Sequence, residues 1–195
     1  TYLRSVLDYA YKSGMKSRRT SSFTGSRIGR GRVFGTLAGA GLVSGGQRRA
    51  IVKGRIAKLK LGNLSAARAH MRYIQRDGVT QEGEAGQLYG RETDEADGSA
   101  FTERCDGDRH QFRFIVSADD ATEIGDLKPF IRELMQKVES DLETTLDWVA
   151  VDHFNTGHPH THIVIRGKAE DGKDLIIAKD YISHGIRQRA GELLT

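Results

Sequence analysis

The sequence predicts an α+β fold, a ferredoxin-like antiparallel sheet with helices packed on one face. Two patterns support this prediction. Short segments in which apolar and polar residues alternate, or in which apolar residues run unbroken between turn residues, indicate strands. Segments with an apolar residue every three to four positions lie between them and indicate helices. The predicted order of elements is β-α-β-α-β-β-β-α.

The first predicted strand and helix carry many basic side chains. Residues 48–60 mix basic and apolar residues with an approximate period of two, which predicts a strand with its basic side chains exposed. Gly62 ends that strand, and a helix follows from about Ser65 to Gly78. Residues 80–107 are rich in Gly, Glu and Asp and therefore predict a loop.

The later elements follow from the same two patterns. We expect strands at 110–117, 148–151, 163–165 and 175–178, and helices at 121–145 and 179–194. Pro129 fits the first turn of its helix, because the backbone N–H that proline lacks has no partner within the helix there.

The chain of 195 residues, 37% of them hydrophobic, is long enough for one domain with a tail. Residues 1–47 are basic and rich in Gly and Ser, which predicts a flexible arm, so we place the domain at 48–195. Because the chain opens on Thr1, we expect a trimmed protein or a piece of a longer one. The single Cys105 excludes an internal disulfide framework. The most apolar stretch, 33–46, is shorter than the roughly 20 residues of a membrane span.

The formal net charge of +4 conceals a strong asymmetry along the chain. Residues 1–80 contain 17 Lys and Arg against two Asp and Glu and carry +15, whereas residues 81–195 carry −11. A solubilising basic tail explains part of this difference. An asymmetry of this size nevertheless favours binding to nucleic acid or another anionic surface.

Four histidines, at positions 153, 158, 160 and 162, lie within ten residues between two predicted buried strands. A turn centred on 156–157 makes the segment a β-hairpin. His153 then lies directly opposite His160 and diagonal to His162, with Cβ atoms roughly 4.5–5.5 Å apart for the facing pair. His158 falls beside the loop. The compact group is therefore His153, His160 and His162.

Three neutral imidazoles that hold a divalent ion and leave positions open form a catalytic type of metal site, because a closed structural site needs a fourth protein ligand. The alternative is that these histidines are ordinary surface residues. Their spacing on one hairpin favours the metal site. Imidazole ligands suit Mn²⁺, Co²⁺, Ni²⁺ or Zn²⁺ better than Mg²⁺.

The segment DHFNTGHPHTHIVIRG, residues 152–167, resembles the third motif of conjugative DNA relaxases (mobilisation nucleases), members of the HUH endonuclease superfamily. Two histidines flank one residue in that motif. His160 and His162 match this pair, and His153 matches the third ligand of the family. Many relatives have Asp where this chain has Asn155. We therefore expect Asn155 and His158 to contact the metal ligands, or in the case of His158 the substrate, rather than the metal itself.

The segment ARAHMRYIQRDGV, residues 67–79, resembles the first relaxase motif, with the nucleophile at Tyr73. Composition alone does not choose among six tyrosines. The resemblance implies an HUH endonuclease fold, a Mg²⁺ or Mn²⁺ cofactor, and nicking of single-stranded DNA at an origin of transfer through a 5′-phosphotyrosyl adduct. It also implies relaxosome accessory proteins and a type IV secretion coupling protein as partners, in the bacterial cytoplasm.

Arg68, Arg72 and Arg76 recur every four residues beside Tyr73 and predict a basic stripe along one helix face. Such a stripe would follow a DNA phosphate backbone, although an ordinary solvated face has the same pattern. The group that accepts the tyrosine proton stays open among His70, Asp77 and Asp152.

Two other functions fit parts of the sequence. HPHTHIV, residues 158–164, also resembles the histidine-triad nucleotide hydrolases, in which His160 would be the nucleophile and no metal is needed. That family offers no role for His153 or for the basic helix. The second alternative is a non-catalytic RNA- or DNA-binding module whose histidines are surface contacts.

Overall fold

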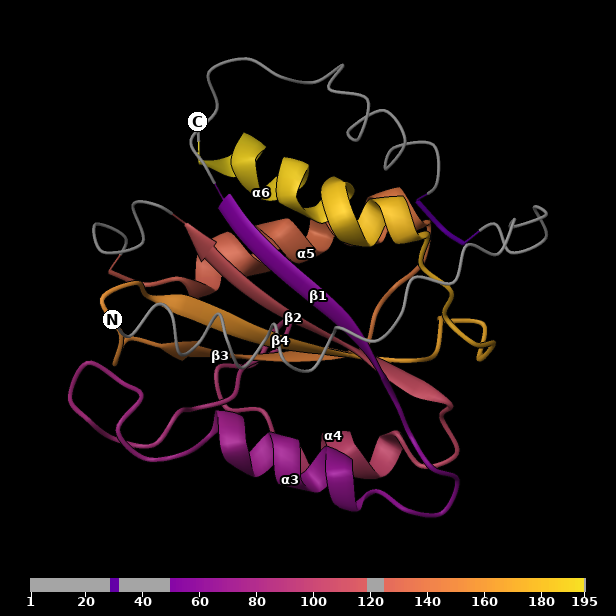
Figure 1. Ribbon diagram of the computed structural model, residues 1–195, viewed down its shortest axis with the longest axis horizontal. Coiled ribbons are helices and arrows are strands. Elements are labelled where there is room, and N and C mark those ends of the chain that lie inside the picture. The colour runs from indigo at the N-terminus through magenta and orange to yellow at the C-terminus, as the bar shows by residue number, and fades with distance from the viewer. Residues whose placement is uncertain (1–28, 32–49, 119–124, 195) are drawn as a thin grey trace, which may run out of the picture.

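The computed structural model describes residues 29–31, 50–118 and 125–194. A four-stranded antiparallel sheet forms the centre (Figure 1). Its strands lie in the spatial order β1 (Ala50–Lys58), β2 (His110–Ala118), β4 (His160–Arg166) and β3 (Trp148–His153). The α+β class and the antiparallel sheet are therefore confirmed.

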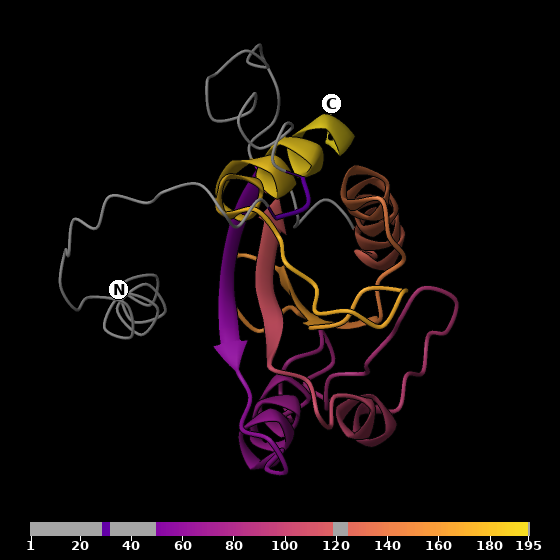
Figure 2. The same cartoon turned by 90° about the vertical axis from the view of Figure 1, so that its right-hand side faces the viewer.

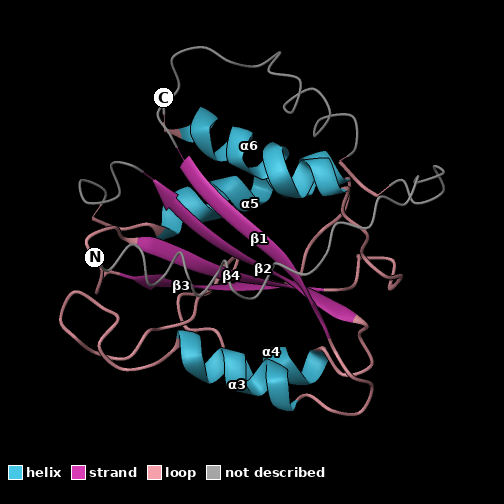
Figure 3. Ribbon diagram, in the orientation of Figure 1, coloured by secondary structure: helices cyan, strands magenta, loops and turns pink. Residues whose placement is uncertain are grey.

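Helices cover both faces of this sheet, so the expectation of helices on one face is wrong. The helices α3 (Ser65–Ile74) and α4 (Gly98–Arg104) lie on one side, and α5 (Lys128–Leu142), the π-helical turn η1 (Tyr181–Gly185) and α6 (Ile186–Leu193) lie on the other. Figures 1 and 3 show the two groups below and above the strands, and Figure 2 shows the same separation from the side.

The reason is that β3 and β4 are apolar on both faces. Ala150, Ile163 and Ile165 belong to the larger core under α5 and α6, whereas the alternate residues Val149 and Val164 pack with α3 and α4. Unbroken apolar runs are typical of strands buried on both sides. The runs in the sequence thus already contained this signal.

The helix that carries the first motif is shorter than predicted. It ends at Ile74 rather than near Gly78, and Gln75 is its C-cap residue. The N–H of Gly78, which would bond to the Ile74 carbonyl if the helix continued, donates to Gly83 O at 3.1 Å. The carbonyl of Ile74 is consequently free for another donor.

Two further elements differ from the prediction. The range 80–107 contains α4, whose N-cap Asp97 accepts hydrogen bonds from the N–H groups of Ser99 and Ala100. The stretch 175–178 is not a strand of the sheet, since within it only Ile177 forms an isolated bridge.

The partner in that bridge belongs to the predicted arm. Arg30 pairs in parallel with Ile177, and its guanidinium donates to the Leu142 carbonyl at 2.8 Å. The rest of the arm, 1–28 and 32–47, lies outside the described residues, as does the start of the helix expected from 121. In the described part of the chain, no helix has the length and apolar character needed to cross a membrane.

Candidate metal centre

The β3–β4 hairpin has the predicted register. His153 pairs with His160, and Val151 pairs with His162. All three histidines therefore point to the face covered by α3, and one nitrogen from each lies within 4.8 Å of the others. Their ring centroids are 4.4 to 5.3 Å apart. Among the described residues, no carboxylate or thiol joins this group.

Hydrogen bonds determine which nitrogen each ring can offer. His153 is fully buried, and its Nε2–H donates to the carbonyl of Ile74 at 2.7 Å. Its Nδ1 is also buried and has no hydrogen-bond partner among the described residues. In His160, Nδ1–H donates to the carbonyl of His158 at 3.1 Å, which leaves Nε2 with its lone pair. Metal-ligating histidines typically donate their other N–H to such a carbonyl, which fixes the tautomer.

Burial keeps all three rings neutral. It is the main cause that lowers the pKa of His153 to about 4. The hydrogen bond to Ile74 raises this pKa, whereas the neighbouring His160 and Arg76 lower it. The pKa of His162 falls to about 2, again mainly by burial. The pKa of His160 is lowered for the same main reason.

A divalent transition-metal ion fits this site, because three neutral imidazoles converge and His153 Nδ1 otherwise stays unsatisfied in the interior. His153 would offer Nδ1 and His160 Nε2. An ion held by only these three ligands among the described residues would keep coordination positions open.

His158 and Asn155 both lie in the exposed connection between the strands. The carbonyl of His158 accepts hydrogen bonds from His160 and from the hydroxyl of Thr156, at 2.8 Å in the second case. His158 thus supports a ligand through its backbone rather than its ring. No hydrogen bond joins the Asn155 side chain to the three rings.

Helix α3 connects Tyr73 to the histidines. Tyr73 is 53% exposed, and the next residue, Ile74, provides the carbonyl that holds His153. The guanidinium carbon of Arg76 lies 4.6 Å from the centre of the Tyr73 ring, and Arg76 also donates to the Tyr73 carbonyl at 3.1 Å. His70, one turn earlier, stacks against the same ring with 6.4 Å between centroids.

Only two of the three predicted stripe residues lie on the helix. Arg68 and Arg72 are exposed on α3, whereas Arg76 follows its end and folds back over Tyr73. The expectation of one continuous stripe is therefore wrong for Arg76. Its charge lies near the histidines, where it lowers the pKa of all three.

Two of the three candidates for the proton acceptor are disfavoured by the structure. The third, Asp77, is exposed beyond the end of α3 and stays open as a candidate. Asp152 points to the opposite face of the sheet from His153, and its Oδ1 accepts hydrogen bonds from Tyr89 and Thr161 at 2.8 and 2.6 Å. It is therefore excluded as a base for Tyr73. His70 lies beside Tyr73, but burial and two arginines lower its pKa to about 3, so it is a weak base.

Sequence reasoning missed the Ile74 carbonyl as the partner of His153, 79 residues away. Every residue has a carbonyl, so no side-chain pattern could reveal this contact. No known family model and no curated protein sequence matches the chain. The likeness to relaxases consequently rests on the two sequence motifs alone.

Proposed function

We propose that this chain is the catalytic domain of a relaxase, a site- and strand-specific nickase and strand transferase for single-stranded DNA at an origin of transfer. One observation supports the proposal above all. The hydrogen bond from His153 to Ile74 ties the histidine cluster to the helix residue that follows Tyr73. Under this proposal the nucleophile Tyr73 and the histidine cluster lie on two neighbouring elements that this hydrogen bond joins.

The reaction exchanges one phosphodiester for another. The phenolic oxygen of Tyr73 bonds to phosphorus, the bond from phosphorus to the 3′-oxygen breaks, and the departing oxygen takes a proton to become a free 3′-OH. The tyrosine proton leaves to a base or to water. Because the phosphotyrosyl ester conserves the energy of the broken bond, the same step run backwards rejoins a strand, which hydrolysis by water cannot do.

A divalent ion on His153, His160 and His162 would neutralise charge that develops on the phosphate oxygens. The residues of the chain do the positioning. The buried rings stay neutral, Ile74 and His158 orient two of them, and Arg76 brings a positive charge to the Tyr73 ring. Imidazole ligands favour Mn²⁺ and its neighbours over Mg²⁺.

This proposal places the protein in the bacterial cytoplasm. Relaxosome accessory proteins and a type IV secretion coupling protein would be its partners. These assignments follow from the relaxase likeness alone.

Tyr73→Phe tests the nucleophile, because it removes one oxygen and keeps the ring that contacts His70 and Arg76. Wild-type protein incubated with labelled single-stranded DNA and Mn²⁺ should give a covalent band that resists mild acid. The variant should fold, bind metal and bind DNA normally but give no band. Mass spectrometry should locate the DNA on the peptide that contains Tyr73.

Other outcomes identify the competing functions. A histidine-triad hydrolase would form an acid-labile adduct on His160 and would keep reacting after Tyr73→Phe. A binding module would form no adduct with either protein. An adduct on another tyrosine, such as Tyr89 or Tyr181, would overturn the assignment of Tyr73.

A further inference from the structure

Two arginines lie directly opposite each other on the sheet, next to the metal centre. Arg55 on β1 pairs with Arg113 on β2, and Arg113 pairs in turn with Val164 on β4. Val164 is two residues from His162, so the arginines share the face of the histidines. Arg55 is exposed and Arg113 is half-buried.

Within the described part of the chain, no negative charge balances this pair. The guanidinium of Arg113 donates to Gln111 Oε1 at 3.1 and 3.3 Å, and it forms no ion pair with any carboxylate of the described residues. By contrast, Arg166 and Arg189 form two-pronged ion pairs with aspartates. Like charges that face each other across two strands are destabilising.

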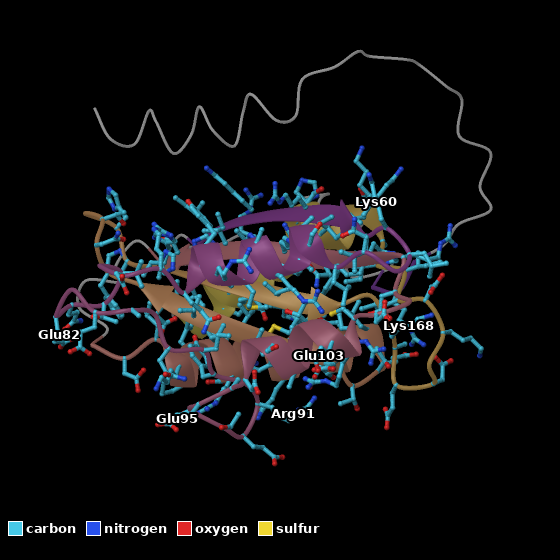
Figure 4. The ribbon with its side chains drawn as sticks, turned by 90° about the horizontal axis from the view of Figure 1, so that it is seen from below. Lys60, Glu82, Arg91, Glu95, Glu103 and Lys168 are labelled. Carbon is cyan, nitrogen blue, oxygen red and sulfur yellow. The ribbon has the colours of Figure 1, made fainter. Side chains whose placement is uncertain are left out.

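The electrostatic surroundings of the pair are positive. Burial and Arg55 lower the pKa of Arg113 to about 10, and the same two arginines help to hold the neighbouring His70 neutral. His70 in turn stacks on Tyr73. Seen from below in Figure 4, the labelled Glu95, Glu103 and Arg91 lie on the α4 side, whereas Lys60, just beyond β1, lies on the opposite side.

We propose that Arg55 and Arg113 form a binding subsite for a backbone phosphate of single-stranded DNA, adjacent to the phosphate at the metal centre. The choice of DNA as the ligand rests on the proposed function. Guanidinium groups bind phosphate through paired N–H donors, and a phosphate between the two arginines removes their repulsion. Strand geometry puts the Cα atoms of Arg113 and His162 roughly 8 Å apart, so the two sites are close enough for one DNA strand to contact both.

The subsite is tested by binding alone, in EDTA, so that neither metal nor cleavage enters. Fluorescence anisotropy of a labelled oligothymidine should show that Arg113→Gln and Arg55→Gln each weaken affinity about tenfold. Each should also reduce the salt dependence by about 0.7 in log–log slope for every phosphate that the protein no longer neutralises. Arg187→Gln, which removes an equal charge from an exposed position on α6, should change neither value by as much.

A double-mutant comparison locates the phosphate that the pair binds. The oligonucleotide carries one neutral methylphosphonate in place of a phosphate. If the replaced phosphate is the one that Arg113 binds, Arg113→Gln should cause no further loss of affinity for this oligonucleotide. In Arg113→Gln, relief of the repulsion with Arg55 opposes loss of the hydrogen bonds to Gln111, so thermal unfolding serves to check that the variant is folded. If Arg113→Gln proves unstable, the affinity and salt slope of Arg55→Gln, at an exposed position, still test the subsite.

Wild-type affinity and salt slope in both variants would overturn the subsite, as would a failure of the native protein to bind the oligonucleotide. These results are separable from the nicking reaction. Arginine-dependent DNA binding without any Tyr73 adduct would keep the subsite and reject the relaxase. A Tyr73 adduct together with unchanged DNA affinity in both arginine variants would keep the relaxase and reject the subsite.

Discussion

Single nitrogen atoms determine what the histidine cluster can bind. His153 reaches the cluster with Nδ1 only because Ile74 takes its Nε2–H, and His160 offers Nε2 because the His158 carbonyl takes its Nδ1–H. His158 contributes a backbone atom, which any residue would supply. A change of its side chain should therefore matter little.

We accordingly expect His153→Ala, His160→Ala and His162→Ala each to abolish strong Mn²⁺ binding, since two imidazoles hold the ion too weakly. His158→Ala is the matched control and should bind nearly as well as wild type. Calorimetric titration with Mn²⁺ measures both. Loss of binding in His158→Ala together with its retention in His153→Ala would contradict the observed hairpin register.

At the scale of elements, α4 shows how a short helix is held against the sheet. Cys105 follows its last turn and is fully buried. Its Sγ donates to the Phe101 carbonyl at 3.4 Å and accepts from Gln111 Nε2 at the same distance. Gln111 is also the acceptor for Arg113, so this small network joins α4 to the proposed phosphate subsite.

Burial raises the pKa of the Cys105 thiol, so less thiolate is present at pH 8 than in a free cysteine, and its formation is displaced to higher pH. We expect native protein to resist iodoacetamide at pH 8, whereas the urea-unfolded chain should react fully. Mass spectrometry of the Cys105 peptide measures the rate. Equal rates in the two states would mean that α4 opens readily.

At the scale of the whole molecule, an ionic cluster joins η1 and α6 to α5. Asp141 on α5 accepts two hydrogen bonds from Arg189 on α6, at 2.8 and 2.6 Å, and one from the Tyr181 hydroxyl at 2.7 Å. The carboxyl side chain is only 9% exposed. Removing it leaves a partly buried guanidinium and a buried hydroxyl without this acceptor.

Asp141→Ala should reduce the free energy of unfolding by about 3 kcal/mol. This value is near the lower end of the range for breaking a buried ion pair, because Arg189 keeps part of its surface in water. The control Asp171→Ala removes an exposed partner of Lys173 and should have little effect. Urea denaturation followed by circular dichroism compares them. Similar small decreases in both would show that solvent screens the Asp141 cluster.

Local sequence patterns were sufficient to predict which histidines form the candidate site. A short turn and the two-residue period of strands determine the hairpin register, so the grouping of His153, His160 and His162 was readable in advance. The same alternation separates Asp152 from His153. The N-cap at Asp97 was likewise a readable signal for α4, although the acidic, Gly-rich surroundings favoured a loop.

Contacts between distant segments were decided by the tertiary structure alone. The bond from His153 to Ile74, the fold of Arg76 over Tyr73 and the pairing of Arg55 with Arg113 each depend on how separate elements pack. A long connection, such as the one between β1 and β2, does not determine how the two strands align. The entropy of closing a loop changes slowly with its length, so alignments shifted by a few residues have similar closure costs. The sequence by itself thus determined the grouping of the three histidines, whereas packing decided which atoms support them and which charges lie beside them.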